Sequence, residues 1–410
     1  MRDKGIARVR RTIAAVVLGV VALVSAHDAR AAVDGETVES FIVRLWPEAK
    51  ARGVTRDTFD RAFADFKPDP SLGKLNAKQP EFERPFGAYV EERVTATRIE
   101  AGRRKAQEHA GLLQSIESRF GVDGKVVLAV WGMETAYGAS KGNRAVVRSL
   151  ATLAMTDARR APFWRRELIS ALVLAQERGL APETLVGSWA GAMGHTQFIP
   201  STYTRFAVDF DRDGQRDLTG SVADALASTA NYLAKSGWIT GLPWGFEVKL
   251  PQRFDYGWAA PGRTRTLAEW LAAGVKPGPA VGAVTLGTEL QLVMPVGAAG
   301  PTFLVTQNFK AILRYNLSVA YALSVGHLAD RIAGGAAFQT SWPTEPPLSR
   351  AEREELNSLL AARGHAASTG TAGDAKAAIR AAQRALRLPD DGYANAALLT
   401  RLRAGRQSSL

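Results

Sequence analysis

Residues 126–138 read VVLAVWGMETAYG, and the rest of the chain is organised around this stretch. Apolar side chains occupy nearly every side of a helix drawn through it, and a helix that is apolar all round is buried rather than amphipathic. One acidic residue, Glu134, stands near its end. The stretch therefore predicts a buried helix that delivers a single carboxyl group to wherever it ends.

Glu134 is our candidate general acid. It is the only Asp or Glu between Gly124 and Thr156. Desolvation among apolar side chains disfavours the charged form of a carboxyl group and raises its pKa, which makes it a usable proton donor near neutral pH. The residues alone support equally a glutamate whose long side chain simply reaches solvent from the helix end.

Composition places the chain among exported globular proteins. Its 410 residues are enough for two or three domains, 46% of them are apolar, and there is no cysteine. The formal net charge is +12; residues 1–31 carry six basic and two acidic side chains, so removing them leaves about +8. A basic surface suits nucleic acid, an acidic membrane face or an acidic cell-wall polymer, and export argues against nucleic acid.

The first 31 residues have the pattern of a secretory signal peptide. Basic residues precede an apolar run at 13–24, and Ala29-Arg30-Ala31 offers a small-residue cleavage site. An uncleaved anchor is the alternative, although the run is short for a membrane span. Because the chain has no cysteine, no cysteine-linked lipid is available to anchor it, and we expect no stable membrane anchor after signal cleavage.

The periodicities predict a mainly α fold with a small β region. Helical spacing of apolar residues marks 36–50, 56–66 and a segment from Pro162 to just before Gly179, and the charge-rich stretch 89–111 predicts one long exposed helix. Alternating or β-rich patterns mark strands at 246–250, 290–293 and 303–305, the last two as a β-hairpin.

Residues 188–203, SWAGAMGHTQFIPSTY, stand out by composition. Gly191 and Gly194 permit close approach of backbone, and Gln197 is able to hydrogen-bond a sugar or its acetamido group. A tightly packed loop whose glycines serve main-chain geometry alone explains the same composition. A second candidate lies in 308–329, where Tyr315 and Tyr321 suit either a sugar-binding groove or a core; we interpret His327 there as structural.

The acidic segment DFDRDGQRD at 209–217 resembles the first half of an EF-hand loop. Its predicted calcium ligands are Asp209, Asp211, Asp213, the Gln215 carbonyl and Asp224. Position 12 of the loop is Gly220 where an EF-hand has glutamate, so Asp224 would have to reach back. Asp224 also fits a capping box with Ser221, and a plain acidic surface turn remains the alternative.

The C-terminal segment forms a separate prediction. SWPTEPP at 341–347 is a proline-rich linker, and the roughly sixty residues beyond it pattern as three helices. The low apolar bulk of this module suggests a binding attachment rather than an enzyme.

Together these residues resemble the lytic murein transglycosylase B family over nearly the whole mature chain. The stretches that carry the resemblance are QPEFERPF (79–86), RVTATRIEAGR (93–103), VWGMETAYG (130–138), RSLATLA (148–154), SWAGAMGHTQFIPSTY (188–203), VADALASTANYLAKSGW (222–238) and RYNLSVAYALSV (314–325). The tail is similar to a peptidoglycan-binding domain, but Gly370-Thr-Ala-Gly-Asp replaces the usual DG-x-x-G turn. The resemblance implies a signal peptide (1–31), a catalytic domain (34–338), a linker (339–347) and a peptidoglycan-binding domain (348–405).

The resemblance implies a lysozyme-like enzyme that cleaves the β-1,4 bond between N-acetylmuramic acid and N-acetylglucosamine in peptidoglycan and leaves a 1,6-anhydro end. Glu134 would act first as acid and then as base. The implied substrate-binding residues are Ser188, Gln197, Arg159, Arg160, Tyr232, Asn316 and Tyr321. It further implies a structural calcium ion at the acidic loop, no organic cofactor, glycan strands as partner, no nucleic acid, a monomer and a periplasmic location.

Two other functions are compatible with the residues. A muramidase of the same fold would hydrolyse the bond with a second carboxylate that positions water, as glycosidases with two carboxylates do. A non-catalytic wall-binding protein would use the C-terminal module and the basic surface alone.

Overall fold

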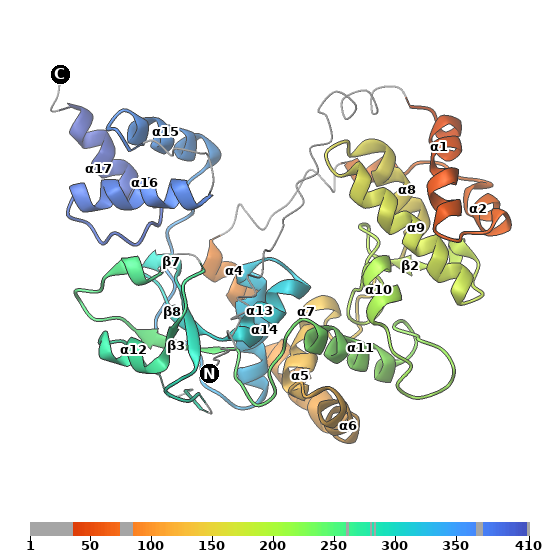
Figure 1. Cartoon of the computed structure of the whole chain (residues 1–410), viewed down its shortest axis with the longest axis horizontal. Coiled ribbons are helices and arrows are strands. Elements are labelled where there is room, and N and C mark those ends of the chain that lie inside the picture. The colour runs from red at the N-terminus through yellow and green to blue at the C-terminus, as the bar shows by residue number, and fades with distance from the viewer. Residues whose placement is uncertain are drawn as a thin grey trace, which may run out of the picture.

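A computed structural model describes residues 36–73, 85–259, 262–278, 281–282, 284–365 and 372–407. The predicted signal peptide lies outside these residues. Figure 1 shows the α1, α2, α8 and α9 helices at one end, α5, α7 and α14 nearer the middle, and a small sheet with three C-terminal helices at the other end. The mainly α fold with a β region, predicted from periodicity, is confirmed.

The first helical lobe is built around one apolar core that includes Phe41, Leu150 and Trp164. Its helices are α1 (Val38–Ala51), α2 (Arg56–Phe63), α8 (Val146–Thr156), α9 (Ala161–Glu177) and α10 (Pro200–Phe206), with the short strands β1 (Arg144–Ala145) and β2 (Val186–Gly187) beside them. Pro162 lies in the first turn of α9, where a missing backbone N–H costs nothing. The helices predicted at 36–50, at 56–66 and from Pro162 are therefore confirmed within a few residues.

The second helical lobe contains the central helix predicted from residues 126–138. Its helices are α4 (Phe86–Arg93), α5 (Ala96–Glu108), α6 (Ala110–Phe120), α7 (Gly124–Thr135), α11 (Val222–Lys235), α13 (Gln307–Tyr315) and α14 (Val319–Ile332). Every α7 residue except Lys125 and Glu134 is buried. The neighbours Ala225 and Leu226 on α11 belong to the cores of the first and second lobe respectively, so this helix is shared by both.

The prediction of one continuous helix at 89–111 is wrong. The chain leaves helical geometry at Val94 (φ −112°, ψ 56°), and the Thr95 hydroxyl accepts a hydrogen bond from the Arg98 backbone N–H to start α5. Threonine side chains favour such N-caps because they supply an acceptor that the first turn lacks. A second break at His109 separates α5 from α6.

The β region is a five-stranded antiparallel sheet packed on the second lobe. Its strand order is β4 (Arg265–Thr266), β6 (Glu289–Val293), β8 (Thr302–Val305), β3 (Gly245–Lys249) and β5 (Lys276–Pro277), and α12 (Leu267–Ala272) packs beside it. The predicted pairing of 290–293 with 303–305 is confirmed, with Leu292 opposite Leu304. Leu304 faces the sheet's own core while Phe303 and Val305 join the core of the second lobe.

The C-terminal helices α15 (Arg350–Ala361), α16 (Ala372–Ala385) and α17 (Ala396–Gln407) form a module with its own leucine-rich core. A capping box formed by Ser349 and Glu352 starts the first of them. Buried Asp391 joins this module to the sheet region: its Oδ2 accepts a hydrogen bond of 2.7 Å from the backbone N–H of Ala298, in β7 (Pro295–Ala298). Its Oδ1 accepts from Gln383 Nε2 inside the module.

Asp330 on α14 gives the fold a pH dependence. Burial raises the pKa of its carboxyl to about 7, although the Trp244 Nε1–H donates to Oδ2 at 2.9 Å. The unfolded chain releases this proton near pH 4, whereas the folded chain keeps it until about pH 7, so this carboxyl destabilises the fold progressively as pH rises through that window.

We expect Asp330→Asn to raise the melting temperature at pH 8 and to change it little at pH 4, because asparagine keeps an acceptor for Trp244 without a charge. A shift of about three pKa units corresponds to roughly 4 kcal/mol as an upper bound. Thermal melts of both proteins from pH 4 to pH 8 measure the difference. A gap between the two that does not widen with pH would contradict the assignment.

Candidate active site

Glu134 lies at the last turn of α7, where the two helical lobes meet. It is partly exposed, whereas Met133 and Thr135 on either side are buried. The helix ends there because Ala136 and Tyr137 adopt left-handed φ values of 49° and 61°, an uncommon conformation for residues other than glycine. The Tyr137 hydroxyl donates to the Arg98 carbonyl at 3.0 Å and ties this turn to α5.

The Glu134 carboxyl has a phenol as a direct partner. The Tyr321 hydroxyl, from α14, donates to Glu134 Oε1 at 2.6 Å. Tyr321 stacks nearly parallel on Tyr315, with ring centroids 6.4 Å apart and an interplanar angle of 8°. Burial, followed by the negative charge of Glu134, raises the pKa of Tyr321 well above its usual value, so the phenol stays neutral and acts as a donor.

The loop at 193–198 adjoins the end of α7, where the Thr135 hydroxyl donates to the His195 carbonyl. Met193 and Phe198 exchange backbone hydrogen bonds of 2.9 and 3.0 Å and close the loop. Gln197 has a left-handed φ of 54°, and its Nε2 donates to the carbonyls of Lys141 and Gly194 at 3.1 and 3.0 Å. Both amide hydrogens are thus committed to the chain, so what Gln197 offers a ligand is its carbonyl oxygen as an acceptor.

Ser188 begins the turn that leads into this loop. Its Oγ accepts a hydrogen bond of 3.0 Å from the Ala192 backbone N–H, and its own N–H donates to the Ala192 carbonyl at 2.8 Å. The hydroxyl hydrogen of Ser188 is not required by these two bonds. Ser188 is therefore a turn residue whose hydroxyl hydrogen is able to donate to a sugar oxygen.

Tyr232 and Tyr315 line a small hollow beside Gln197. The hollow has a volume of about 190 Å³ and is lined by Gln197, Phe198, Ile199, Thr202, Tyr232, Arg314 and Tyr315. The Tyr232 hydroxyl donates to the Arg314 carbonyl, and its ring packs edge-on to Tyr315 at 5.1 Å. Since Tyr315 contacts the cores of both lobes, the hollow lies at their junction.

Asn316 and the arginines occupy less direct positions. Asn316 Oδ1 accepts from the Ser318 N–H at 3.0 Å, in the turn between α13 and α14. Arg160 lies over the rings of Phe163 and Trp164, 4.7 and 4.5 Å from their centroids, and Arg159 is exposed at the same turn. These contacts of Arg160 stay within its own lobe, and a substrate role for the arginines remains a prediction.

Sequence reasoning missed His195. Trp131 Nε1–H donates to His195 Nδ1 at 3.1 Å, and the Thr135 hydroxyl donates to the His195 carbonyl at 2.6 Å. The motif GHTQF contains His195 two residues before Gln197, which is the only sequence signal that pointed to it. The pairing with Trp131, 64 residues away, depends on the tertiary fold.

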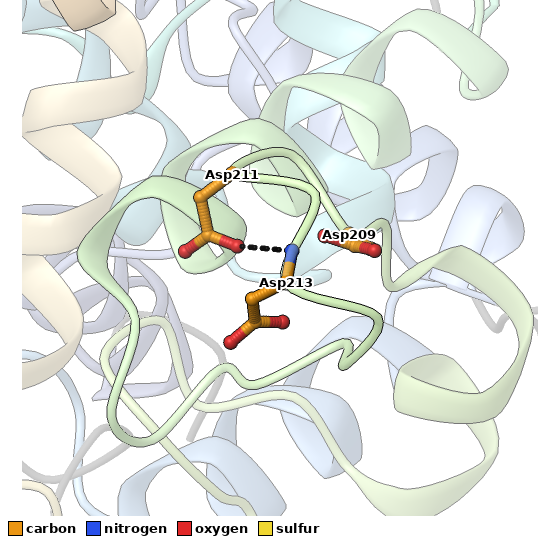
Figure 2. Close-up of side chains that lie close together, drawn as sticks. All are labelled: Asp209, Asp211 and Asp213. Atoms are coloured by element: carbon orange, nitrogen blue, oxygen red, sulfur yellow. Dashed lines mark hydrogen bonds between the residues drawn. The ribbon is translucent and has the colours of Figure 1, made fainter.

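The acidic loop brings three of its predicted ligands together. Ligand atoms of Asp209, Asp211 and Asp213 all lie within 4.8 Å of one another. Figure 2 shows the three side chains gathered in the loop. Asp209 Oδ1 is buried and has no hydrogen-bond partner among the residues that the structure describes. A buried carboxylate oxygen without a partner is costly unless a cation or water satisfies it, so these residues fit a hard cation such as calcium.

Asp224 is placed differently from the prediction. It is fully buried, and its Oδ1 and Oδ2 accept from the backbone N–H groups of Phe210 and Asp217 at 2.7 and 2.8 Å. Asp224 therefore supports the loop from beneath and lies outside the cluster of three aspartates. Its predicted capping partner is confirmed, since the Ser221 hydroxyl accepts from the Asp224 N–H. Gln215 donates its own N–H to Asp213 Oδ1 at 2.7 Å.

Two helical lobes that meet at one carboxylic acid beside a small sheet define the class: the chain has the lysozyme-like fold of transglycosylases. The Transglycosylase SLT domain family matches residues 37–330, and the chain belongs to this family. It is 31% identical to membrane-bound lytic murein transglycosylase B of Escherichia coli (strain K12) over 265 residues, 61% of this chain and 68% of that protein.

Solved structures show the same relationship. SltB3 from Pseudomonas aeruginosa in complex with NAG-anhNAM-pentapeptide is 46% identical and superposes with a TM-score of 0.84, covering 90% of this chain and all of that one. The Escherichia coli lytic transglycosylase Slt35 in complex with calcium is 27% identical, with a TM-score of 0.59 over 72% of this chain and 92% of that one. Among the described residues, no helix is both long and apolar enough to cross a membrane.

Proposed function

We propose that this protein is a lytic transglycosylase that cleaves the β-1,4 bond between N-acetylmuramic acid and N-acetylglucosamine in peptidoglycan. One observation carries the proposal: the Glu134 carboxyl accepts a hydrogen bond from Tyr321, whose ring stacks on Tyr315, a residue that contacts the cores of both lobes. Three segments in contact with Glu134 or its immediate neighbours, 137–143, 188–198 and 315–321, contain no Asp or Glu. Hydrolysing glycosidases ordinarily use two carboxylates, so a single one favours a reaction in which the sugar supplies its own nucleophile.

In this reaction Glu134 serves twice. The protonated carboxyl donates its proton to the glycosidic oxygen as the bond to the anomeric carbon breaks. The carboxylate so formed then takes the proton of the C6 hydroxyl of the same muramic acid, whose oxygen bonds to the anomeric carbon and closes the 1,6-anhydro ring. Glu134 ends protonated and no water is consumed. Tyr321, which donates to Oε1, stabilises and orients the intermediate carboxylate.

Gln197 and Ser188 suit the recognition of an acetamido sugar. The Gln197 carbonyl oxygen is able to accept from an acetamido N–H, and the Ser188 hydroxyl is able to donate to a sugar oxygen. The hollow beside Tyr232 and Tyr315 offers aromatic walls against which a pyranose ring packs. The match to SltB3, a structure that holds a NAG-anhNAM-pentapeptide, supports this substrate class.

The test is mass spectrometry of the soluble products released from purified peptidoglycan by the purified protein. Anhydro-muropeptides, one water lighter than reducing-end products, support the proposal. Reducing-end products would instead assign hydrolysis to the same fold. Wall binding without released products, even at high enzyme concentration, would favour a non-catalytic binding protein.

We propose further that the protein acts in the periplasm after signal cleavage and that residues 348–405 bind peptidoglycan. The order of basic, apolar and small residues in 1–31 supports export. The C-terminal helices, joined to the sheet region through Asp391, would hold the wall polymer close to the catalytic lobes.

The acidic loop is proposed to hold one structural calcium ion through Asp209, Asp211 and Asp213. Bound there, the ion would neutralise three clustered carboxylates and fix the loop between α10 and α11.

Calcium is expected to raise the melting temperature, and chelation is expected to lower it. A ligand present at a hundred times its dissociation constant stabilises a fold by about 2.7 kcal/mol. Differential scanning calorimetry with calcium and with chelator measures the change. In Asp209→Asn the response to calcium should disappear, whereas Asp65→Asn, on the first lobe, should respond like the parent. A parent protein whose melting temperature ignores calcium would contradict the site.

A further inference from the structure

His195 belongs to the loop that carries Gln197 and is buried against the catalytic helix α7. Its side chain is 8% exposed. The Trp131 indole N–H donates to its Nδ1 at 3.1 Å, and Trp131 lies three residues before Glu134 on α7. An Nδ1 that accepts a hydrogen bond carries no hydrogen, so the neutral ring is protonated at Nε2.

The same histidine is attached to α7 at a second point. Its carbonyl oxygen accepts from the Thr135 hydroxyl at 2.6 Å, and that hydroxyl in turn accepts from the Gly138 N–H at 2.9 Å. Gly138 packs so closely on the imidazole that a Cβ there would lie 2.7 Å from Nδ1. The residues on both sides of Glu134 are thus fixed to His195.

The loop is held on its far side as well. The His195 N–H donates to the Leu218 carbonyl at 2.9 Å, and the Tyr315 hydroxyl donates to the Thr196 carbonyl at 2.6 Å. Gln197 follows in its left-handed conformation. His195 is therefore the point at which the Gln197 loop and the α7 helix are joined by side-chain contacts.

We infer that His195 is a positioning residue that sets the distance and orientation of Gln197 relative to Glu134; the inference rests on the proposed function. His195 acts through the bond from Trp131 and does not transfer a proton. Placement of a substrate-binding amide matters because a shift of about 1 Å at a reacting centre is able to cost roughly a hundredfold in rate.

The electrostatic surroundings are consistent with a permanently neutral ring. Burial is the largest cause that lowers the pKa of His195 to about 4; Lys141 and Lys105 act in the same direction, and Asp217 opposes them. At neutral pH the imidazole therefore keeps Nδ1 as an acceptor for Trp131.

The test compares His195→Leu with His195→Asn. Leucine fills the space but offers Trp131 no acceptor, whereas the asparagine Oδ1 is able to occupy the place of Nδ1. His327→Leu is the matched control: His327 is also buried, at 7% exposure, with its pKa likewise lowered to about 4, but it stacks on Phe338 away from Glu134. Initial rates on soluble glycan strands give kcat and KM, and melting curves confirm that each variant is folded at the assay temperature.

We expect His195→Leu to lower kcat about ten- to a hundredfold while KM changes less than about threefold, and His195→Asn to recover most of the loss. His327→Leu should lower the melting temperature and leave kcat unchanged. Either a His195→Leu enzyme with kcat within twofold of the parent, or a His195→Asn enzyme as slow as His195→Leu, would overturn the inference. A parent protein that releases no anhydro-muropeptides would overturn the proposed function, and this inference with it.

Discussion

Glu134→Gln is expected to lower the release of anhydro-muropeptides by about a thousandfold or more. General acid or base catalysis by one group contributes roughly a hundred- to ten-thousandfold, and this residue is proposed to perform both steps in succession. Glutamine has nearly the same size and keeps an oxygen that accepts the Tyr321 hydroxyl hydrogen, so the site should stay intact. The loss should therefore fall on kcat, with KM little changed.

The measurement is the rate of product release from purified peptidoglycan by the parent and by the variant. Unchanged melting temperature and unchanged sedimentation with intact cell walls would show that folding and binding survive. A Glu134→Gln protein with a tenth or more of parental activity would mean that another group supplies the proton, and the single-carboxylate mechanism would fall.

Tyr321→Phe should produce the second-largest loss, a decrease in kcat of about ten- to a hundredfold. The change removes the hydroxyl that donates to Glu134 Oε1 at 2.6 Å but keeps the ring that stacks on Tyr315. A hydrogen bond to a charged group contributes roughly 1.5–3 kcal/mol, and this one is worth most when Glu134 is ionised between its two proton transfers.

Tyr256→Phe provides the comparison. Tyr256 lies beside the sheet in the short helix η3 (Tyr256–Ala259), packed edge-on against Phe254. The Tyr256→Phe variant also lacks one phenolic hydroxyl, and its kcat should match that of the parent enzyme. Equal losses in the two tyrosine variants would indicate a general effect on the fold, and no loss in Tyr321→Phe would remove this residue from the mechanism.

The central helix could be predicted from the sequence because its signal is local. Apolar residues on every side of 126–133 leave burial as the favourable solution, and Glu134 is then the residue that marks the helix end. The cluster of Asp209, Asp211 and Asp213 could also be predicted from the sequence. Aspartates at alternate positions of a tight turn lie close together because of the local backbone alone. Two-residue strands such as β4 and β5 are too short to show a periodic pattern, so the complete sheet could not be predicted from the sequence.

Contacts between distant segments could not be obtained in the same way. Tyr321 is 187 residues from Glu134, and no spacing rule joins them. Asp224 was predicted as a ligand by its type and position, but its burial beneath the loop commits its oxygens to backbone N–H groups, as accounting for buried polar groups requires. The left-handed Gln197 likewise follows from the closure of its loop and not from any local preference for that conformation.

The helix α11 carries one further consequence. Because Ala225 lies in one core and Leu226 in the other, the two helical lobes pack against the same helix. A change of packing in either core therefore acts on a helix that the other core also contacts.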